Sequence, residues 1–129
     1  PKKGEEFVFL NPVITRPKGN AEQEEGCLSL PGVRGKVKRP EKVLLTAYMS
    51  NGKEYEAEVD GLMARVVQHE LDHLDGVLFP DRMSDTAKAD IAEEIEEFEF
   101  DFLSRRNSGE LPSDAEIAAQ IAEWETKYC

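Results

Sequence analysis

Hydrophobic and polar residues alternate in two short segments, residues 43–49 and residues 53–59. Between the two segments stands Asn51-Gly52, a dipeptide that readily adopts the positive φ angles of a tight hairpin turn. Alternation with a period of two is typical of half-buried strands, whose successive side chains point to opposite faces of a sheet. The sequence therefore predicts an antiparallel β-hairpin over residues 43–59.

Shorter apolar runs precede this hairpin. Residues 7–10 and 13–14 are aromatic or aliphatic, and Pro12 stands between them. Because proline has no backbone N–H to donate to a sheet, we expect a strand that is interrupted or ended at Pro12. The polar stretch that follows, residues 16–24, predicts a loop.

Two further extended segments come before the hairpin. Residues 26–32 predict a short extended piece that ends in a turn at Pro31-Gly32, a dipeptide typical of turns. Residues 33–37 then alternate apolar or small side chains with basic ones, which predicts a partly exposed strand. The first 60 residues therefore consist mainly of short strands.

The pattern changes to a helical one after Asp60. Asp60 is a suitable N-cap for a helix from about Leu62 to Leu74, and Asp75-Gly76 ends it. Apolar side chains within the segment are spaced to form a helical face. Together with the strands, this helix predicts an α+β fold in which antiparallel strands surround a central helix.

Two amphipathic helices are predicted beyond Pro80. The first begins at Ser84 or Asp85, ends near residues 107–109, and has apolar residues spaced i, i+4, i+7 and i+11 from Ile91. The second begins at Ser113, which forms a capping box with Glu116. We expect the apolar stripes of both helices to pack into the core, and their acidic faces to be solvated.

Charge narrows the set of partners. The chain has 129 residues and a formal net charge of −11, and residues 81–129 contribute 14 acidic against 5 basic residues, a difference of −9. Such a surface repels nucleic acids and anionic lipids, so we expect no direct binding to either. No apolar stretch approaches the roughly 20 residues of a membrane span. With two cysteines far apart in the sequence, we expect a reducing compartment rather than a disulfide framework.

Both histidines of the chain lie in one motif, His69-Glu70-Leu71-Asp72-His73. A spacing of four residues on a helix places the two imidazoles on the same face, where they can bind one divalent metal ion. Glu70, between them, is then placed to take a proton from a water at the metal. Asp72 and Asp75 are candidates to accept hydrogen bonds from the imidazole N–H groups.

Two histidines leave a ligand position to fill, because catalytic zinc sites normally have three protein ligands. The chain has no third histidine, so the donor is a thiolate or a carboxylate. Cys27, next to a glycine in an extended segment, is a better candidate than the terminal Cys129. The alternative is a carboxylate of the second helix, from Glu93, Glu94 or Glu97.

Two motifs, Glu25-Gly26-Cys27-Leu28-Ser29 and the segment from Gln68 to Gly76, resemble the second and third signature motifs of peptide deformylases. The resemblance extends over roughly residues 7–100. It implies removal of the formyl group from the N-terminal formyl-methionine of nascent polypeptides, with release of formate. It also implies one divalent metal ion, natively Fe²⁺, with Zn²⁺ or Ni²⁺ also accepted.

Carried over by motif, the resemblance implies a role for individual residues. Cys27, His69 and His73 would be the metal ligands, and Glu70 the general base and then the general acid. The backbone N–H of Leu28 would help to stabilise the oxyanion. Four further residues would contact the substrate. These are Leu62 and Val66, beside the methionine side chain, and Gly26 and Arg34, at the edge of the peptide groove.

The family's first motif, Gly-x-Gly-x-Ala-Ala-x-Gln, does not occur in this chain. Its glutamine donates to the oxyanion, and losing one such donor typically costs about 10²–10³ in turnover. We therefore expect either a fragment of a longer deformylase or a shortened form. We predict a catalytic domain over residues 1–106 and a helical extension, residues 107–129, that packs on it and offers a surface for homo-oligomers.

Two alternatives to a deformylase stay open. One is a metallopeptidase that uses the same two histidines with a downstream glutamate. The other is a metal-binding remnant without catalysis, which the missing glutamine motif makes plausible. For a deformylase we expect a cytoplasmic protein of the bacterial type, or one located in an organelle.

Overall fold

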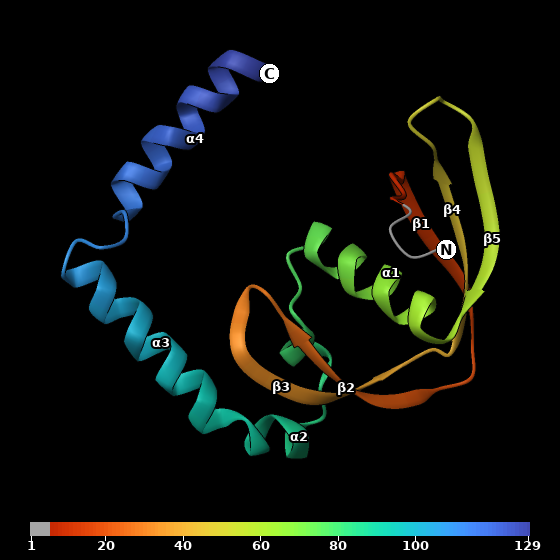
Figure 1. Ribbon diagram of the computed structural model, residues 1–129, viewed down its shortest axis with the longest axis horizontal. Coiled ribbons are helices and arrows are strands. Elements are labelled where there is room, and N and C mark those ends of the chain that lie inside the picture. The colour runs from red at the N-terminus through yellow and green to blue at the C-terminus, as the bar shows by residue number, and fades with distance from the viewer. Residues whose placement is uncertain (1–5) are drawn as a thin grey trace. The chain divides into compact units, whose positions relative to one another are not determined.

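The computed structural model describes residues 6–129 of the chain. The described chain divides into two units, a first that ends at Ala89 and a second, Asp90–Cys129. Figure 1 shows strands and one central helix in the first unit, and helices alone in the second. The packing of residues 107–129 on a catalytic domain stays a prediction.

One sheet of the first unit has three antiparallel strands in the order β1-β4-β5. Its central strand β4 (Lys42–Tyr48) forms a hairpin with β5 (Glu54–Asp60), which confirms the prediction from the alternating pattern. At the turn, the Lys53 N–H donates to Oδ1 of Asn51 over 3.0 Å, and Gly52 has φ +78°. The Asn-Gly pair thus provides both the local hydrogen bond and the left-handed backbone that the turn requires.

The edge strand β1 (Leu10–Lys18) does not end at Pro12, but its pairing is interrupted there, as predicted. Its pairing with β4 shifts register between Leu10 and Val13, and Asn11 has φ +50°. Proline is tolerated here because β1 is an edge strand, and because an irregularity in the ladder removes the need for one N–H donor.

A second sheet consists of β2 (Ala21–Cys27) and β3 (Leu30–Arg39), paired antiparallel. The predicted loop over residues 16–24 is therefore mostly strand, and Pro31-Gly32 lies within β3 rather than at a turn. The chain turns at residues 28–29 instead. Hydrophobic alternation does not predict β2, because most of its side chains are exposed and polar. One of them, Glu24, pairs with Lys36 across the ladder.

The core of the first unit lies between β3, β4, the helix and a short 3₁₀ helix, η1 (Phe79–Arg82). A Cβ built on Gly35 of β3 would lie 2.5 Å from Cε of Met83 and 3.5 Å from the ring of Phe79. The residue after η1 therefore packs directly on the strand backbone. The buried apolar side chains of this core are Leu30, Val33, Val37, Val43, Leu45, Ala47, Ala64, Phe79 and Met83.

The central helix α1 (Gly61–Leu74) has the predicted bounds. Asp60 is its N-cap residue, but its side chain makes no capping hydrogen bond and lies 3.6 Å from Nζ of Lys42 instead. At the C-terminus, Gly76 has φ +71° and its N–H donates to the His73 carbonyl. This left-handed glycine ends the helix directly after the histidine motif.

The helical segment after η1 differs from the prediction of one continuous helix. It consists of α2 (Asp85–Asp90) and α3 (Ala92–Asn107), with a break at Ile91. The last helix, α4 (Asp114–Tyr128), begins with the predicted capping box between Ser113 and Glu116. No helix within residues 6–129 is both long enough and apolar enough to cross a bilayer.

Within the unit Asp90–Cys129 the apolar stripes of α3 and α4 are mostly exposed, although Ile91, where the first stripe begins, is buried. The packing of both stripes into a core stays a prediction. Neither helix contains a buried residue. Along α4, the exposed fraction rises from 37% at Ile117 to 73% at Tyr128. Amphipathic spacing therefore predicted the two helical segments, apart from the break at Ile91.

Candidate metal centre

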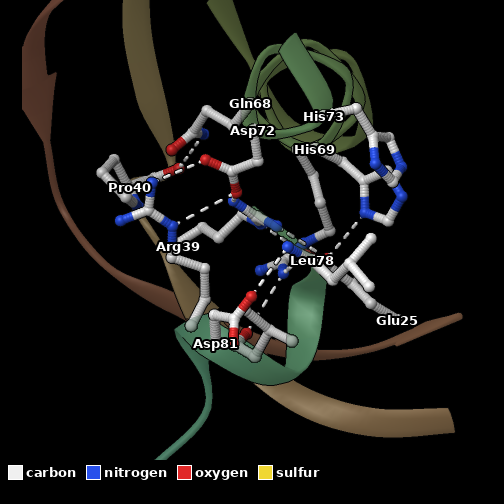
Figure 2. A network of polar contacts seen from close by, with 12 residues as sticks. Glu25, Arg39, Pro40, Gln68, His69, Asp72, His73, Leu78 and Asp81 are labelled. Carbon is white, nitrogen blue, oxygen red and sulfur yellow. Dashed lines mark hydrogen bonds and ion pairs between the residues drawn. The ribbon is translucent and has the colours of Figure 1, made fainter. Parts of the chain in front are cut away.

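Cys27, His69 and His73 converge at one point of the first unit, with their ligand atoms all within 4.8 Å of one another. The Cys27 Sγ lies 3.3 Å from Nε2 of His73, and the two imidazole rings stand edge to face with centroids 4.9 Å apart. Figure 2 shows both imidazoles on the same side of α1. Within residues 6–129, no other three histidine, cysteine or acidic side chains converge in this way.

Local structure accounts for this convergence. The helical repeat places His69 and His73 on one face of α1. At the end of β2, the register shifts between Gly26 and Cys27, directly before the turn into β3. The Ser29 N–H then donates to the Cys27 Sγ over 3.4 Å. Burial raises the pKa of the Cys27 thiol, but hydrogen bonds from Ser29 and His69 outweigh it and lower the pKa overall.

The donor set suits a divalent transition metal. Two imidazole nitrogens and one thiolate are ligands that Zn²⁺ and Fe²⁺ accept. For bonds of about 2.0 and 2.3 Å at a tetrahedral angle, a nitrogen and a sulfur ligand lie about 3.5 Å apart. The observed separation of 3.3 Å between Sγ and Nε2 is close to that value. The three side chains therefore fit one mononuclear ion.

Glu25 orients His69, and the sequence analysis missed this role. Its carboxylate lies 3.1 Å from Nδ1 of His69 and also accepts hydrogen bonds from Arg39 and Arg65. Burial alone would raise the pKa of Glu25, but these hydrogen bonds hold it below its usual value. Because an ionised carboxylate only accepts, Nδ1 carries the proton and Nε2 is free to bind a metal.

Asp72, which we expected beside the imidazoles, has other partners. Its buried carboxylate accepts from Arg39 over 2.7 Å and from Arg82 over 2.6 Å. Burial raises the pKa of Asp72, but these two arginines lower it overall. The other candidate, Asp75, is exposed. The acceptor for His69 is thus two residues before Cys27, where the period of a strand could have indicated it.

Glu70 projects from α1 without a partner. It is exposed, and among residues 6–129 no group donates a hydrogen bond to it or forms an ion pair with it. Gln68, by contrast, donates to the Pro40 and Ala64 carbonyls over 3.1 and 2.9 Å, which links α1 to the start of β4. Glu70 lines the same cavity as Cys27 and His69 and is unpaired among the described residues, whereas Gln68 links two elements.

Two cavities meet at Glu70 and His73. One, of about 480 Å³, is lined by Cys27 and its neighbours in β2 and the following turn, including Gly26 and Leu28. The other, of about 830 Å³, lies between α1, β4 and the segment before β1, and its lining is mostly apolar. The two predicted pocket residues that line both cavities are Leu62 and Val66.

The remaining predicted site residues have different surroundings. Arg34 lines neither cavity; it stands opposite Gly26 in the β2–β3 register and pairs with Glu24 over 3.2 Å. The alternative third ligands, Glu93, Glu94 and Glu97, belong to the second unit and are exposed. The third donor beside the two histidines is therefore the thiol of Cys27.

Fold and site together define an α+β protein with a candidate mononuclear centre of one thiolate and two imidazoles. The sequence profile of the polypeptide deformylase family matches residues 1–89. This chain belongs to that family. The α+β fold with antiparallel strands is thereby confirmed, since solved deformylases share it.

Individual relatives agree with this assignment. A peptide deformylase of Rhodopirellula baltica is 48% identical over 126 residues, which cover 98% of this chain and 63% of the relative. One of Thermodesulfovibrio yellowstonii is 52% identical over 78 residues, or 60% of this chain and 47% of the relative. The chain thus spans less than two thirds of the length of these relatives.

Solved structures agree as well. Arabidopsis thaliana peptide deformylase 1B, in complex with an inhibitor, matches with a TM-score of 0.75 and 39% identity. That match covers 92% of this chain and 65% of the plant chain. The Thermus thermophilus peptide deformylase matches with a TM-score of 0.66 over 74% of this chain and 60% of that one.

Proposed function

We propose that this chain forms the catalytic centre of a deformylase that hydrolyses the formamide bond of N-formyl-methionyl peptides and releases formate. The observation that carries the proposal is the convergence of Cys27, His69 and His73 beside Glu70, whose carboxylate has no partner within residues 6–129. Membership of the polypeptide deformylase family supports it.

We assign Cys27, His69 and His73 as ligands of one divalent ion, natively Fe²⁺. When bound, the ion would polarise the formyl carbonyl and acidify a water. Glu25 keeps the proton of His69 on Nδ1, so that Nε2 can serve as the donor atom. Zn²⁺ and Ni²⁺ suit the same ligands.

Glu70 performs the proton transfers. It takes a proton from the attacking water as the new C–O bond forms, and delivers it to the amine nitrogen as the C–N bond breaks. The products are formate and a free N-terminal methionine. We assign the Leu28 amide as a donor to the carbonyl oxygen, because Leu28 lies in the turn after Cys27 and lines the same cavity.

The two cavities support a proposed position for the substrate. The apolar cavity of about 830 Å³ would take the methionine side chain, with Leu62 and Val66 at its junction with the metal site. The peptide that follows methionine would extend past Gly26, with Arg34 at its edge. Nascent formylated polypeptides are then the partners of the protein.

The test is formate release from a formyl-Met tripeptide by anaerobically prepared, iron-loaded protein. We expect Glu70→Gln to bind metal normally and to lose turnover by about 10²–10⁴-fold. Cys27→Ala should lose both metal and turnover. Glu123→Gln, an exposed acid on α4, is the matched control and should keep full activity.

Three results would contradict the proposal. Equal turnover by Glu70→Gln would remove the assigned proton carrier. Cleavage of internal peptide bonds, with metal retained in Cys27→Ala, would indicate a metallopeptidase. Stoichiometric metal without formate release in the unaltered protein would indicate a metal-binding module without this activity.

A further inference from the structure

Arg65 is a buried arginine to which the proposed chemistry gives no role. It lies on α1 one turn before His69, is 7% exposed, and lines the cavity that contains Cys27. Arginine is rarely buried unless its donors are matched by acceptors. Its partners therefore indicate what the side chain does.

The Arg65 guanidinium links α1 to both strands of the hairpin that carries Cys27. Nη1 donates to the Glu25 carboxylate over 2.5 Å and to the Val37 carbonyl over 3.1 Å. Nη2 donates to the Ala21 carbonyl over 2.8 Å. One planar group thus holds the first residue of β2, the acid near its end, and the backbone of β3.

These contacts also determine how Glu25 meets His69. Oε1 of Glu25 accepts from Arg65 and from Nε of Arg39, whereas Oε2 accepts from Nη2 of Arg39 over 3.0 Å. Oε2 is also the oxygen 3.1 Å from Nδ1 of His69. With Oε1 occupied by two guanidinium donors, the carboxylate presents Oε2 to the imidazole. Figure 2 shows this line of contacts from Arg39 through Glu25 to His69.

We propose that Arg65 is a positioning residue of the metal centre. It fixes the β2–β3 hairpin, and with it Cys27, against the helix that carries the two histidines, and it directs the Glu25 carboxylate toward His69. The inference rests on the proposed function, because it requires the three side chains to bind a metal. A lysine has a point charge without a planar fork and cannot hold acceptors on both strands at once.

The experiment compares Co²⁺-loaded protein with its Arg65→Met and Arg65→Lys variants. The ligand-field and thiolate-to-cobalt absorption bands report the geometry of the centre, and competition with a chelator reports affinity. We expect both variants to shift the bands and to lose about 10–100-fold in affinity. The matched control is Arg106→Met, because Arg106 also joins a carbonyl, that of Pro112, to a carboxylate, that of Asp114, but lies in the second unit. Arg106→Met should change neither the cobalt absorption bands nor the metal affinity.

Thermal melting of the metal-free proteins separates positioning from folding. Should Arg65→Met not fold, Arg65→Lys carries the test alone. Unshifted bands and unchanged affinity in a folded variant would overturn the proposal, and so would full rescue by lysine, since charge alone would then suffice. Absence of cobalt binding by the unaltered protein would instead contradict the metal centre of the proposed function.

Discussion

The two units of this chain differ in whether their charged side chains are buried or exposed. The unit that ends at Ala89 buries four charged side chains, Glu25, Arg39, Arg65 and Asp72, each at most 7% exposed. The unit Asp90–Cys129 has only exposed acids, and an ion pair such as Arg105 with Glu110 lies at its surface. Buried pairs depend on every partner, whereas exposed pairs contribute little, so the same interaction has different consequences in the two units.

The largest expected effect comes from breaking the buried network. Glu25→Gln removes the carboxylate that Arg39 and Arg65 share and leaves Arg65 with backbone carbonyls alone, whereas Arg39 keeps Asp72. Removing one partner of a buried pair costs about 3–5 kcal/mol. Urea unfolding of the metal-free protein, followed by circular dichroism, measures this cost. The control Glu110→Gln removes an exposed partner of Arg105 and should cost at most about 0.5 kcal/mol. Equal losses in the two variants would show that burial does not distinguish the units.

A second comparison uses aromatic residues. Phe79 is 1% exposed and packs on β3, whereas Trp124 on α4 is 55% exposed. Phe79→Ala should therefore cost about 3–5 kcal/mol, because it removes apolar contacts and leaves a cavity. Trp124→Ala should cost no more than about 0.5 kcal/mol under the same conditions. A large loss from the tryptophan variant would show that another surface covers α4 in solution.

Burial also explains which elements the sequence could predict. The hairpin over residues 43–59 and helix α1 follow periodic patterns, and each has the predicted position. The strand β2 does not, because its buried side chain is an acid, Glu25, which pattern analysis assigns to the surface. Its burial depends on arginines from β3 and α1, which no local pattern reveals.

In the candidate site, too, some features follow from local sequence patterns and others from tertiary contacts. The spacing of His69 and His73 on a helix is local information, and Cys27 followed from the need for a third donor. The acceptor of His69 is Glu25 rather than Asp72, because Arg39 and Arg82 occupy the Asp72 carboxylate. The period of a strand places Glu25 on the same face as Cys27, but the choice of Glu25 rather than Asp72 as the partner of His69 depends on tertiary packing.

A smaller effect is expected where β3 meets the residue after η1. An added methyl at Gly35 would lie 2.5 Å from Cε of Met83, whose flexible side chain can partly move away. We expect Gly35→Ala to cost about 1–3 kcal/mol, as overpacking does. In a Met83→Ala background the same substitution should cost measurably less, and a double-mutant cycle from urea unfolding gives the difference. Additive costs would show that the two side chains do not compete for space.

The smallest effect belongs to the start of α4. Oγ of Ser113 accepts from the Glu116 N–H over 3.3 Å, and the Glu116 carboxylate accepts from the Ser113 N–H over 2.7 Å. Ser113→Ala removes this cap and should cost about 1 kcal/mol of local helix stability, seen as faster amide exchange in the first turn.

The cap also makes α4 sensitive to acid. Hydrogen bonds from the Ser113 backbone and side chain lower the pKa of Glu116 below its usual 4.5. A carboxylate with a lowered folded pKa stabilises its helix fully above the unfolded pKa, and the contribution is lost as pH falls through the folded value. An NMR titration of the Glu116 side chain should therefore give a midpoint below 4.5 that moves back toward it in Ser113→Ala. An unmoved midpoint would show that the backbone N–H of residue 113, which alanine retains, rather than the serine hydroxyl, lowers this pKa.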